Sequence, residues 1–307
     1  MPEPAIEVRG LTKSYGKTHA VRGVDLTVAS GEIFALLGPN GAGKTTTVEI
    51  LEGFTRRDAG EVRVLGRDPA KNDIAQKARI GIVAQEVSPD PFLTVTEMVH
   101  MVAGTYPRPR PADEVIELVG LADKRSTRAG RLSGGQQRRL DVALALVGDP
   151  DLLFLDEPTT GFDPDARLEA WAMIRDLRTL GKTVLLTTHY MDEAQQLADR
   201  VAVIAGGRII AEGTPDTLGG RGSAASRVRF RLPPSAPPLP AEIAAIVTAS
   251  NGVFTFSAEA PVPLLNSLTG WAMAHGIALD GLQVARPSLE ETYLQLVAGN
   301  GAATGEA

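Results

Sequence analysis

The sequence predicts an α/β protein with two domains. Short continuous apolar runs, such as IFALL and LLFL, recur between helical segments over the first two thirds of the chain. Such runs are typical of parallel strands that are buried on both faces of a sheet. The composition changes near residue 220, and the 307 residues, 43% of them apolar, are enough for two cores. We therefore expect one domain at residues 1–218 and a smaller one, with its linker, at residues 219–307.

The first domain begins with short strands. Residues 5–65 alternate in polarity and are interrupted by glycines, which indicates strands joined by turns. The apolar run at residues 33–37 ends in a glycine-rich turn, and we expect a helix from that turn to Gly53. Another buried strand is expected to begin at Arg79.

A helical subdomain follows, at about residues 95–140. Thr94 and Glu97 have the spacing of a capping box, which indicates the start of a helix. The segment PADEVIELVG is typical of a second short helix that ends at Gly120.

The remaining elements alternate between strands and helices. LLFLDE at residues 152–157 and TVLLTTH at residues 183–189 are predicted as buried strands, and a hairpin is expected around Gly206. GGRGSAAS at residues 219–226 is predicted as a flexible linker and LPPSAPPLP as a stiff extended segment. Strands and helices after them indicate a small C-terminal α/β domain.

Composition excludes several classes of protein. The net charge of -6 disfavours binding to nucleic acid through charge alone. The absence of cysteine excludes disulfides and thiolate metal sites. The apolar runs are too short to cross a bilayer, and the N-terminal residues lack the pattern of a secretion signal. If this protein serves a membrane, we expect another chain to supply the span.

A phosphate-binding loop is predicted at GPNGAGKTTT. It fits the pattern G-x-x-x-x-G-K-[ST] and lies between a buried strand and a helix, a context that favours this reading over a plain glycine-rich turn. Glycines let backbone N–H groups point at phosphate oxygens, and the helix adds its N-terminal dipole. Lys44 would meet the β- and γ-phosphates and Thr45 would bind Mg²⁺. The predicted nucleotide-binding residues are Gly38, Pro39, Asn40, Gly41, Ala42, Gly43, Lys44, Thr45 and Thr46.

Polar residues that end two later strands are candidates for catalysis. Asp156 and Glu157 follow LLFL, at the strand end where ligands bind in open α/β sheets. Asp156 would hold Mg²⁺ and Glu157 would orient or deprotonate the attacking water. The alternative is that both acids cap the next element. His189 ends TVLLTTH and is a candidate for contacting the γ-phosphate.

A second anion-binding loop is predicted at LSGGQQ. Ser133 is a natural N-cap, and the glycines expose backbone N–H groups without any lysine. The residues of this loop are Ser133, Gly134, Gly135 and Gln136. Arg138 and Arg139 are expected to face solvent or a neighbouring helix. One nucleotide has no evident use for two such loops in one chain.

With these motifs in order, residues 5–215 resemble the nucleotide-binding subunit of ATP-binding cassette (ABC) transporters. Tyr15 matches the aromatic that stacks on adenine, and GPNGAGKT matches the Walker A loop. Gln85 matches the Q-loop glutamine, which contacts Mg²⁺ and faces the membrane partner. LSGGQQ matches the signature motif.

The later motifs extend the resemblance. LLFLDE matches Walker B with its catalytic glutamate, and His189 matches the switch histidine. Asp163 lies in TGFDP, which matches the D-loop, although Phe162 stands where leucine is usual. The resemblance implies catalytic roles for Glu157, His189, Gln85 and Lys44, and Mg²⁺ contacts for Thr45, Gln85 and Asp156.

The family also implies the assembly. Its fold is a P-loop cassette with a mixed sheet core, N-terminal antiparallel strands and a helical subdomain. Two cassettes pair head to tail, and each ATP lies between the Walker A loop of one chain and the signature of the other. A homodimer on a separate transmembrane subunit, peripheral at the cytoplasmic face of the membrane, is therefore expected, with ATP and Mg²⁺ as cofactors.

Three kinds of cassette remain open on the sequence. The closing run at residues 286–294 and the sequence LSGGQQRRLDVA resemble bacterial drug and antibiotic exporters related to daunorubicin-resistance ATPases. An importer motor would share every catalytic residue. A cassette that acts on nucleic acid or ribosomes would usually carry a long coiled coil or a second cassette, and the distance from Gly38 to Ser133 leaves no room for the coil.

Overall fold

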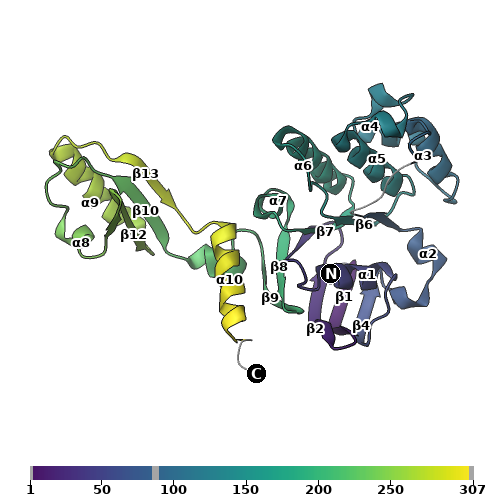
Figure 1. The fold of residues 1–307 in the computed structure, drawn as a ribbon, viewed down its shortest axis with the longest axis horizontal. Helices are drawn as coiled ribbons and strands as arrows, with labels where there is room; N and C mark the ends of the chain where they lie inside the picture. The colour runs from purple at the N-terminus through teal and green to yellow at the C-terminus, as the bar shows by residue number, and fades with distance from the viewer. Residues whose placement is uncertain (1–2, 85–89, 304–307) are drawn as a thin grey trace. The chain divides into compact units, whose positions relative to one another are not determined.

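The structure is a computed structural model that describes residues 3–84 and 90–303 (Figure 1). The chain divides into two compact units, Met1–Pro215 and Asp216–Ala307. Each unit has its own sheet and its own hydrophobic core.

The first unit is built on a six-stranded mixed sheet, as predicted. Its strand order is β5-β6-β7-β3-β8-β9, in which β8 and β9 pair antiparallel and the other neighbours pair parallel. Every residue of β3 and β7 is buried, because other elements cover both faces of the sheet: Phe34 and Leu36 pack in one core with residues of β1, β2, β4 and α1, and α7 contacts both strands. The strands are β3 (Ile33–Leu37), β5 (Ile80–Val83), β6 (Leu152–Asp156), β7 (Thr183–Thr188), β8 (Arg200–Ala205) and β9 (Arg208–Gly213).

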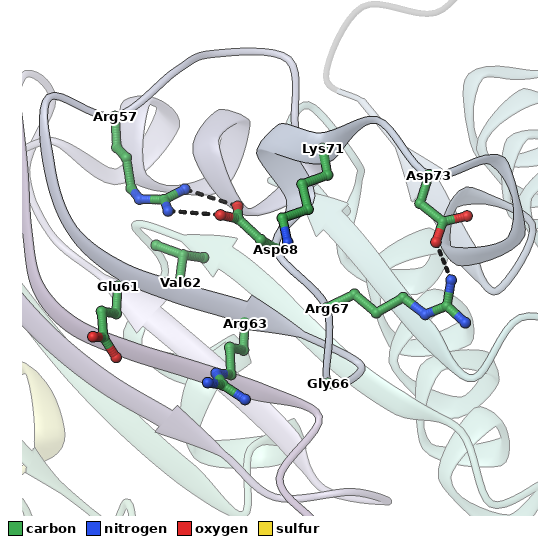
Figure 2. A pocket seen from close by; sticks show the side chains of 9 residues that line it. All are labelled: Arg57, Glu61, Val62, Arg63, Gly66, Arg67, Asp68, Lys71 and Asp73. Atoms are coloured by element: carbon green, nitrogen blue, oxygen red, sulfur yellow. Dashed lines mark hydrogen bonds and ion pairs between the residues drawn. The ribbon is translucent and has the colours of Figure 1, made fainter.

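A three-stranded antiparallel sheet precedes it, in the order β2-β1-β4, and confirms the predicted N-terminal strands. Its strands are β1 (Ile6–Tyr15), β2 (Thr18–Val28) and β4 (Ala59–Val64). A groove of about 480 Å³ borders β4 (Figure 2). Arg57 donates to both carboxylate oxygens of Asp68, at 2.9 and 2.8 Å, and Arg67 pairs with Asp73, so that much of the charge in the groove is internally neutralised.

Two helices of the first unit, α3 and α5, begin at the predicted caps. Gly43 and Gly53, both in the left-handed region, flank α1. Capping boxes formed by Thr94 with Glu97 and by Ser133 with Gln136 begin α3 and α5. In Figure 1, α3, α4 and α5 gather at the end of this unit away from β1, β2 and β4, and they form the predicted helical subdomain. The helices are α1 (Lys44–Glu52), α2 (Ile74–Lys77), α3 (Val95–Ala103), α4 (Ala112–Leu118), α5 (Gly134–Leu146), α6 (Pro164–Thr179) and α7 (Met191–Leu197).

The second unit is a small α/β domain, as predicted, with a sheet in the order β11-β12-β10-β13. Val228, Phe230 and Phe256 of the sheet pack with Ile243 and Leu268 of the helices. The elements are β10 (Ser226–Arg231), α8 (Ala241–Ala244), β11 (Thr248–Ser250), β12 (Val253–Ala258), α9 (Pro261–Ala274), β13 (Asp280–Ala285) and α10 (Leu289–Ala303).

The prediction of a flexible linker at residues 219–226 is corrected by the structure. Leu218–Ser223 forms a 3-10 turn, η4, inside the second unit. Leu218 is fully buried and Arg221 Nε donates to Pro287 O at 2.6 Å, so the segment is held by packing despite its glycines. No helix within residues 3–84 and 90–303 is long and apolar enough to cross a membrane.

Candidate active site

The phosphate loop connects β3 to α1 and is shaped by its glycines. Gly41 and Gly43 have φ values of 77° and 104°, in the region that favours glycine. A Cβ on Gly38 would lie 2.4 Å from Ile204 O, so β8 also requires glycine there. The loop therefore turns sharply between a buried strand and a helix N-terminus, which exposes backbone donors to an anion.

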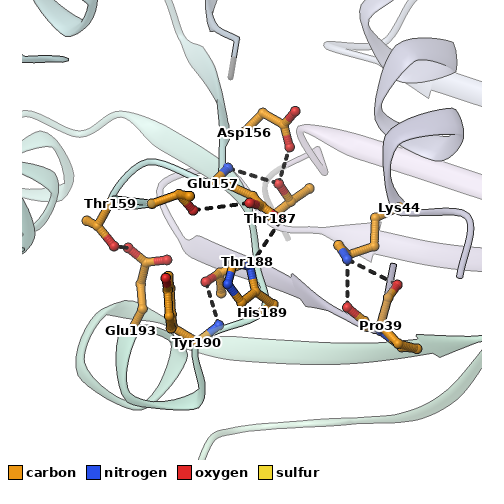
Figure 3. A network of polar contacts seen from close by, with 12 residues as sticks. Pro39, Lys44, Asp156, Glu157, Thr159, Thr187, Thr188, His189, Tyr190 and Glu193 are labelled. Atoms are coloured by element: carbon orange, nitrogen blue, oxygen red, sulfur yellow. Dashed lines mark hydrogen bonds and ion pairs between the residues drawn. The ribbon is translucent and has the colours of Figure 1, made fainter. Parts of the chain in front are cut away.

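Lys44 is the first residue of α1 and is 7% exposed. Its Nζ donates to Gly38 O at 2.6 Å and to Pro39 O at 3.2 Å, as Figure 3 shows. Burial lowers the pKa of Lys44, and the negative charges of Glu157 and Asp156 oppose that shift. The ammonium is thus held at the loop and faces the two acids at the end of β6.

Asp156 and Glu157 lie where β6 ends, and a neighbouring strand positions both. Thr187 of β7 donates its hydroxyl to Asp156 Oδ1. The backbone N–H of Glu157 is directed back at Thr187, with N–O distances of 3.1 Å to the carbonyl and 3.2 Å to the hydroxyl. Glu157 has a φ of 45°, unusual for a residue with a Cβ. Its backbone conformation is therefore imposed by its surroundings.

The Glu157 carboxylate is joined to the end of β7. His189 Nδ1 lies 3.2 Å from Glu157 Oε1, and Thr160 Oγ1 donates to Glu157 Oε2 at 3.1 Å (Figure 3). The Glu157 side chain is 12% exposed and that of His189 is 40% exposed. The Glu157 carboxylate can accept a proton from water, and His189 can hold that carboxylate in place.

These groups line one cleft of about 830 Å³. Residues of β2 and the glycines of the β8–β9 turn complete its wall. Its volume is in the range of small-molecule sites. The predicted residues that line it are Pro39, Asn40, Gly41, Gly43, Lys44, Thr45, Thr46, Asp156, Glu157 and His189.

Other predicted residues lie outside the described lining. Gly38 and Ala42 belong to the phosphate loop but are buried, and Tyr15 is half exposed at the end of β1. The Asp163 side chain accepts from Ala166 N at 2.8 Å and caps α6. Gln85 falls outside the described residues.

The signature loop does not reach this cleft either. None of the described residues that line the cleft comes from Ser133, Gly134, Gly135 or Gln136. Ser133 and Gly134 are exposed, and the predicted N-cap is confirmed, since Ser133 Oγ accepts from Gln136 N at 3.3 Å. The second anion-binding loop is therefore an open surface of this chain.

The cleft suits a metal that is bound together with phosphate. Thr45 and Asp156 line it from opposite elements, α1 and β6. Within the described part of the chain there is no cluster of three or more metal-ligating side chains. One carboxylate and one hydroxyl fit Mg²⁺, which keeps several waters and binds through few protein ligands plus substrate phosphates.

Two functional candidates escaped the sequence reasoning. Thr187 positions both acids, and its place near the end of β7, two residues before His189, is the signal that could have identified it. Arg138 was expected to face solvent or a neighbouring helix, which is wrong. Arg138 is 9% exposed and donates to backbone carbonyls. The next residue, Arg139, instead forms an ion pair with Glu169 at the surface.

Known proteins match both units. A family model described as "ABC transporter" matches residues 21–160, and one described as "ABC transporter domain-containing protein-like, C-terminal domain" matches residues 226–288. The daunorubicin/doxorubicin resistance ATP-binding protein DrrA of Streptomyces peucetius is 41% identical, over 96% of this chain and 93% of that protein. The Nod factor export ATP-binding protein I of Paraburkholderia xenovorans (strain LB400) is 47% identical, over 71% of this chain and 73% of the relative.

Solved structures match the first unit. A nucleotide-free ATP-binding cassette from an ABC transporter has a TM-score of 0.62 and 26% identity, over 69% of this chain and 92% of the other. CbiO1 from Clostridium perfringens, part of the ABC transporter complex cbiONQ, has a TM-score of 0.61 and 28% identity, over 70% and 90% of the two chains. The resemblance drawn from the motifs is thereby confirmed, and the chain belongs to the ATP-binding subunits of the ABC transporter family, which are ATPases.

Proposed function

We propose that this protein is the ATP-hydrolysing motor of an ABC exporter and works as a homodimer on a separate transmembrane subunit. One observation carries the proposal. The cleft of a single chain contains Lys44, both acids and His189, while its signature loop lies on an open surface. A second copy, placed head to tail, would bring its own signature loop to this cleft.

Each side chain has a role that follows from its position. Lys44 and the N–H groups of the phosphate loop bind the β- and γ-phosphates. Thr45 and Asp156 would hold Mg²⁺, which neutralises phosphate charge when it is bound. Glu157 takes the proton of the attacking water, and His189, 3.2 Å from Glu157 Oε1, orients that carboxylate and contacts the γ-phosphate.

The residues outside the cleft act in the dimer. Ser133, Gly134, Gly135 and Gln136 would meet the nucleotide of the second copy, and Asp163 would lie beside that interface. Tyr15 would stack on adenine, and Gln85 would contact Mg²⁺. These assignments rest on the motifs.

Export is favoured by the names of the relatives. The drug-resistance protein of Streptomyces peucetius matches 96% of this chain, and the relative from Paraburkholderia xenovorans is a Nod factor export protein by name. The transmembrane subunit would place this chain at the cytoplasmic face of the membrane. The net charge of -6 disfavours the alternative of binding to nucleic acid through charge alone.

The direction of transport can be tested in everted membrane vesicles. The protein is purified from native membranes together with its membrane subunit, and mass spectrometry identifies that subunit. Both proteins are then overproduced in the cells from which the everted vesicles are prepared. Daunorubicin, the compound in the relative's name, serves as the first fluorescent probe. We expect ATP-dependent accumulation in the vesicle lumen, lost in Glu157→Gln. ATP-dependent depletion of the lumen, or failure of any membrane protein to co-purify, would contradict the proposal.

A further inference from the structure

The guanidinium of Arg138 joins three segments of the cassette. Arg138 lies in the second turn of α5, beyond the signature loop, and is 9% exposed. Nη1 donates to Ala84 O at 2.6 Å, Nη2 to Asp156 O at 2.7 Å, and Nε to Pro158 O at 3.3 Å. Arg138 thus donates to the carbonyl of the residue after β5 and to two carbonyls at and just after the end of β6.

Two of those carbonyls flank Glu157. Residues with a Cβ adopt a left-handed φ only where the surroundings over-determine it, because that conformation is strained. Glu157 has a φ of 45°, and Arg138 holds the peptide oxygens of Asp156 and Pro158 on either side of it. From the opposite strand, Thr187 accepts from the Glu157 N–H. The backbone of this glutamate is therefore fixed from two sides.

Burial of this arginine is unusual enough to require a reason. Removing a guanidinium from water is unfavourable, and carbonyl oxygens supply no full negative charge to compensate. Asp141 forms a buried ion pair with Nη1 at 3.9 Å and supplies part of that charge, but the three carbonyl acceptors lie closer to the guanidinium. The neighbouring Arg139 has an ion pair with Glu169 at the surface. Anchoring α5 alone would not require an arginine directed at the carbonyls of both residues that flank Glu157.

We propose that Arg138 is a positioning residue for ATP hydrolysis. By holding the Asp156 and Pro158 carbonyls, it keeps Glu157 in its left-handed conformation, so that the carboxylate remains within reach of His189 and of the attacking water. The inference rests on the proposed role of Glu157 as the base. It also connects α5 of the helical subdomain directly to the catalytic end of β6.

The first test compares Arg138→Gln and Arg138→Lys with Arg139→Gln, a matched control at the next position. Purified full-length proteins are assayed for kcat with saturating Mg-ATP, for MANT-ATP affinity and for cooperative melting. We expect Arg138→Gln to lower kcat by about tenfold or more, with MANT-ATP affinity within about twofold of wild type. Arg138→Lys should have an intermediate kcat, and Arg139→Gln should retain the wild-type rate.

A double-mutant cycle separates positioning from general support of the fold. If Arg138 acts through Glu157, then Arg138→Gln should cause no further loss of kcat in a Glu157→Gln background. An equal loss in both backgrounds, or MANT-ATP affinity that falls as much as kcat, would overturn the proposal. So would a failure of both Arg138 variants to melt cooperatively, because the guanidinium would then be a folding anchor. Unchanged turnover in Glu157→Gln alone would instead refute the role of Glu157.

Discussion

Two glycine-rich loops begin helices in this cassette, and they differ in how complete they are. The phosphate loop is backed by the fully buried β3, contains a lysine that is 7% exposed, and lines a cleft with two acids and a histidine. The signature loop has no lysine, and Ser133 and Gly134 are exposed. Both loops present backbone N–H groups. In the proposed homodimer, one chain would therefore contribute its phosphate loop to one nucleotide site and its signature loop to the other.

The signature loop is nevertheless well ordered for its task. Gln136 Oε1 accepts from Ser133 N at 3.1 Å, and Ser133 Oγ accepts from Gln136 N at 3.3 Å. This capping box fixes the helix end before any nucleotide arrives. The signature loop is thus pre-formed, but in contrast to the phosphate loop it is not among the described residues that line the cleft.

The largest expected effect is that of Glu157→Gln, in the cleft that contains the phosphate loop. We expect kcat to fall by about 100-fold or more, because the variant removes the base and keeps the shape. ATP binding should persist and an ATP-bound dimer should accumulate. Phosphate release and size-exclusion chromatography measure these, with Glu61→Gln, an exposed glutamate of β4, as the control. Equal rates in Glu157→Gln and wild type would refute the assignment.

Lys44→Ala should weaken nucleotide binding by about 10- to 100-fold, since a charge-assisted contact to phosphate is lost. Titration with MANT-ATP measures the affinity. Lys77→Ala, at an exposed lysine that ends α2, should bind as wild type does. Unchanged affinity in Lys44→Ala would count against the phosphate assignment and would remove the contrast between the two loops.

Ser133→Arg tests the role of the signature loop. A bulky cation at the exposed helix end should block ATP-dependent dimerisation, while MANT-ATP binding to the single chain stays within about threefold of wild type, because the loop does not line the described cleft. Multi-angle light scattering in the presence of ATP decides the first point. An intact dimer would contradict the cross-chain role of this loop.

The smallest expected effect concerns Glu52, at the end of α1. Burial, then the charges of Asp156 and Glu49, raise its pKa to about 8. Between the ordinary pKa of glutamate and about 8 the folded state binds more protons than the unfolded state, so stability falls as pH rises through that window. Glu52→Gln should therefore raise the melting temperature of the cassette by about 2–4 °C at pH 9 and by less at pH 6. A gain that is equal at both pH values would contradict the shift.

Much of this could be predicted from the sequence because the signals are local. Continuous apolar runs determined β3, β6 and β7, and Ser133 and Thr94 marked helix starts through contacts three residues away. The long-range contacts escaped prediction. Arg138 was expected to face solvent or a neighbouring helix, since local sequence does not reveal carbonyl acceptors that lie up to 54 residues away, and Leu218 stabilises a turn in a segment whose glycines indicate a linker. The roles of the site residues remain predictions.

The most direct test of the account mixes two inactive variants, Lys44→Ala and Ser133→Arg. If each site combines the phosphate loop of one chain with the signature loop of the other, a heterodimer of the two variants contains one intact site and one site that is damaged twice. Random assortment would make half of the dimers heterodimers, so recovery of at most roughly one quarter of the wild-type ATPase rate is expected, and less where Ser133→Arg also hinders pairing. A chain that carries both substitutions, mixed with wild type, should form heterodimers with no intact site. No recovery in the first mixture, beyond the sum of the separate variants, would contradict the account.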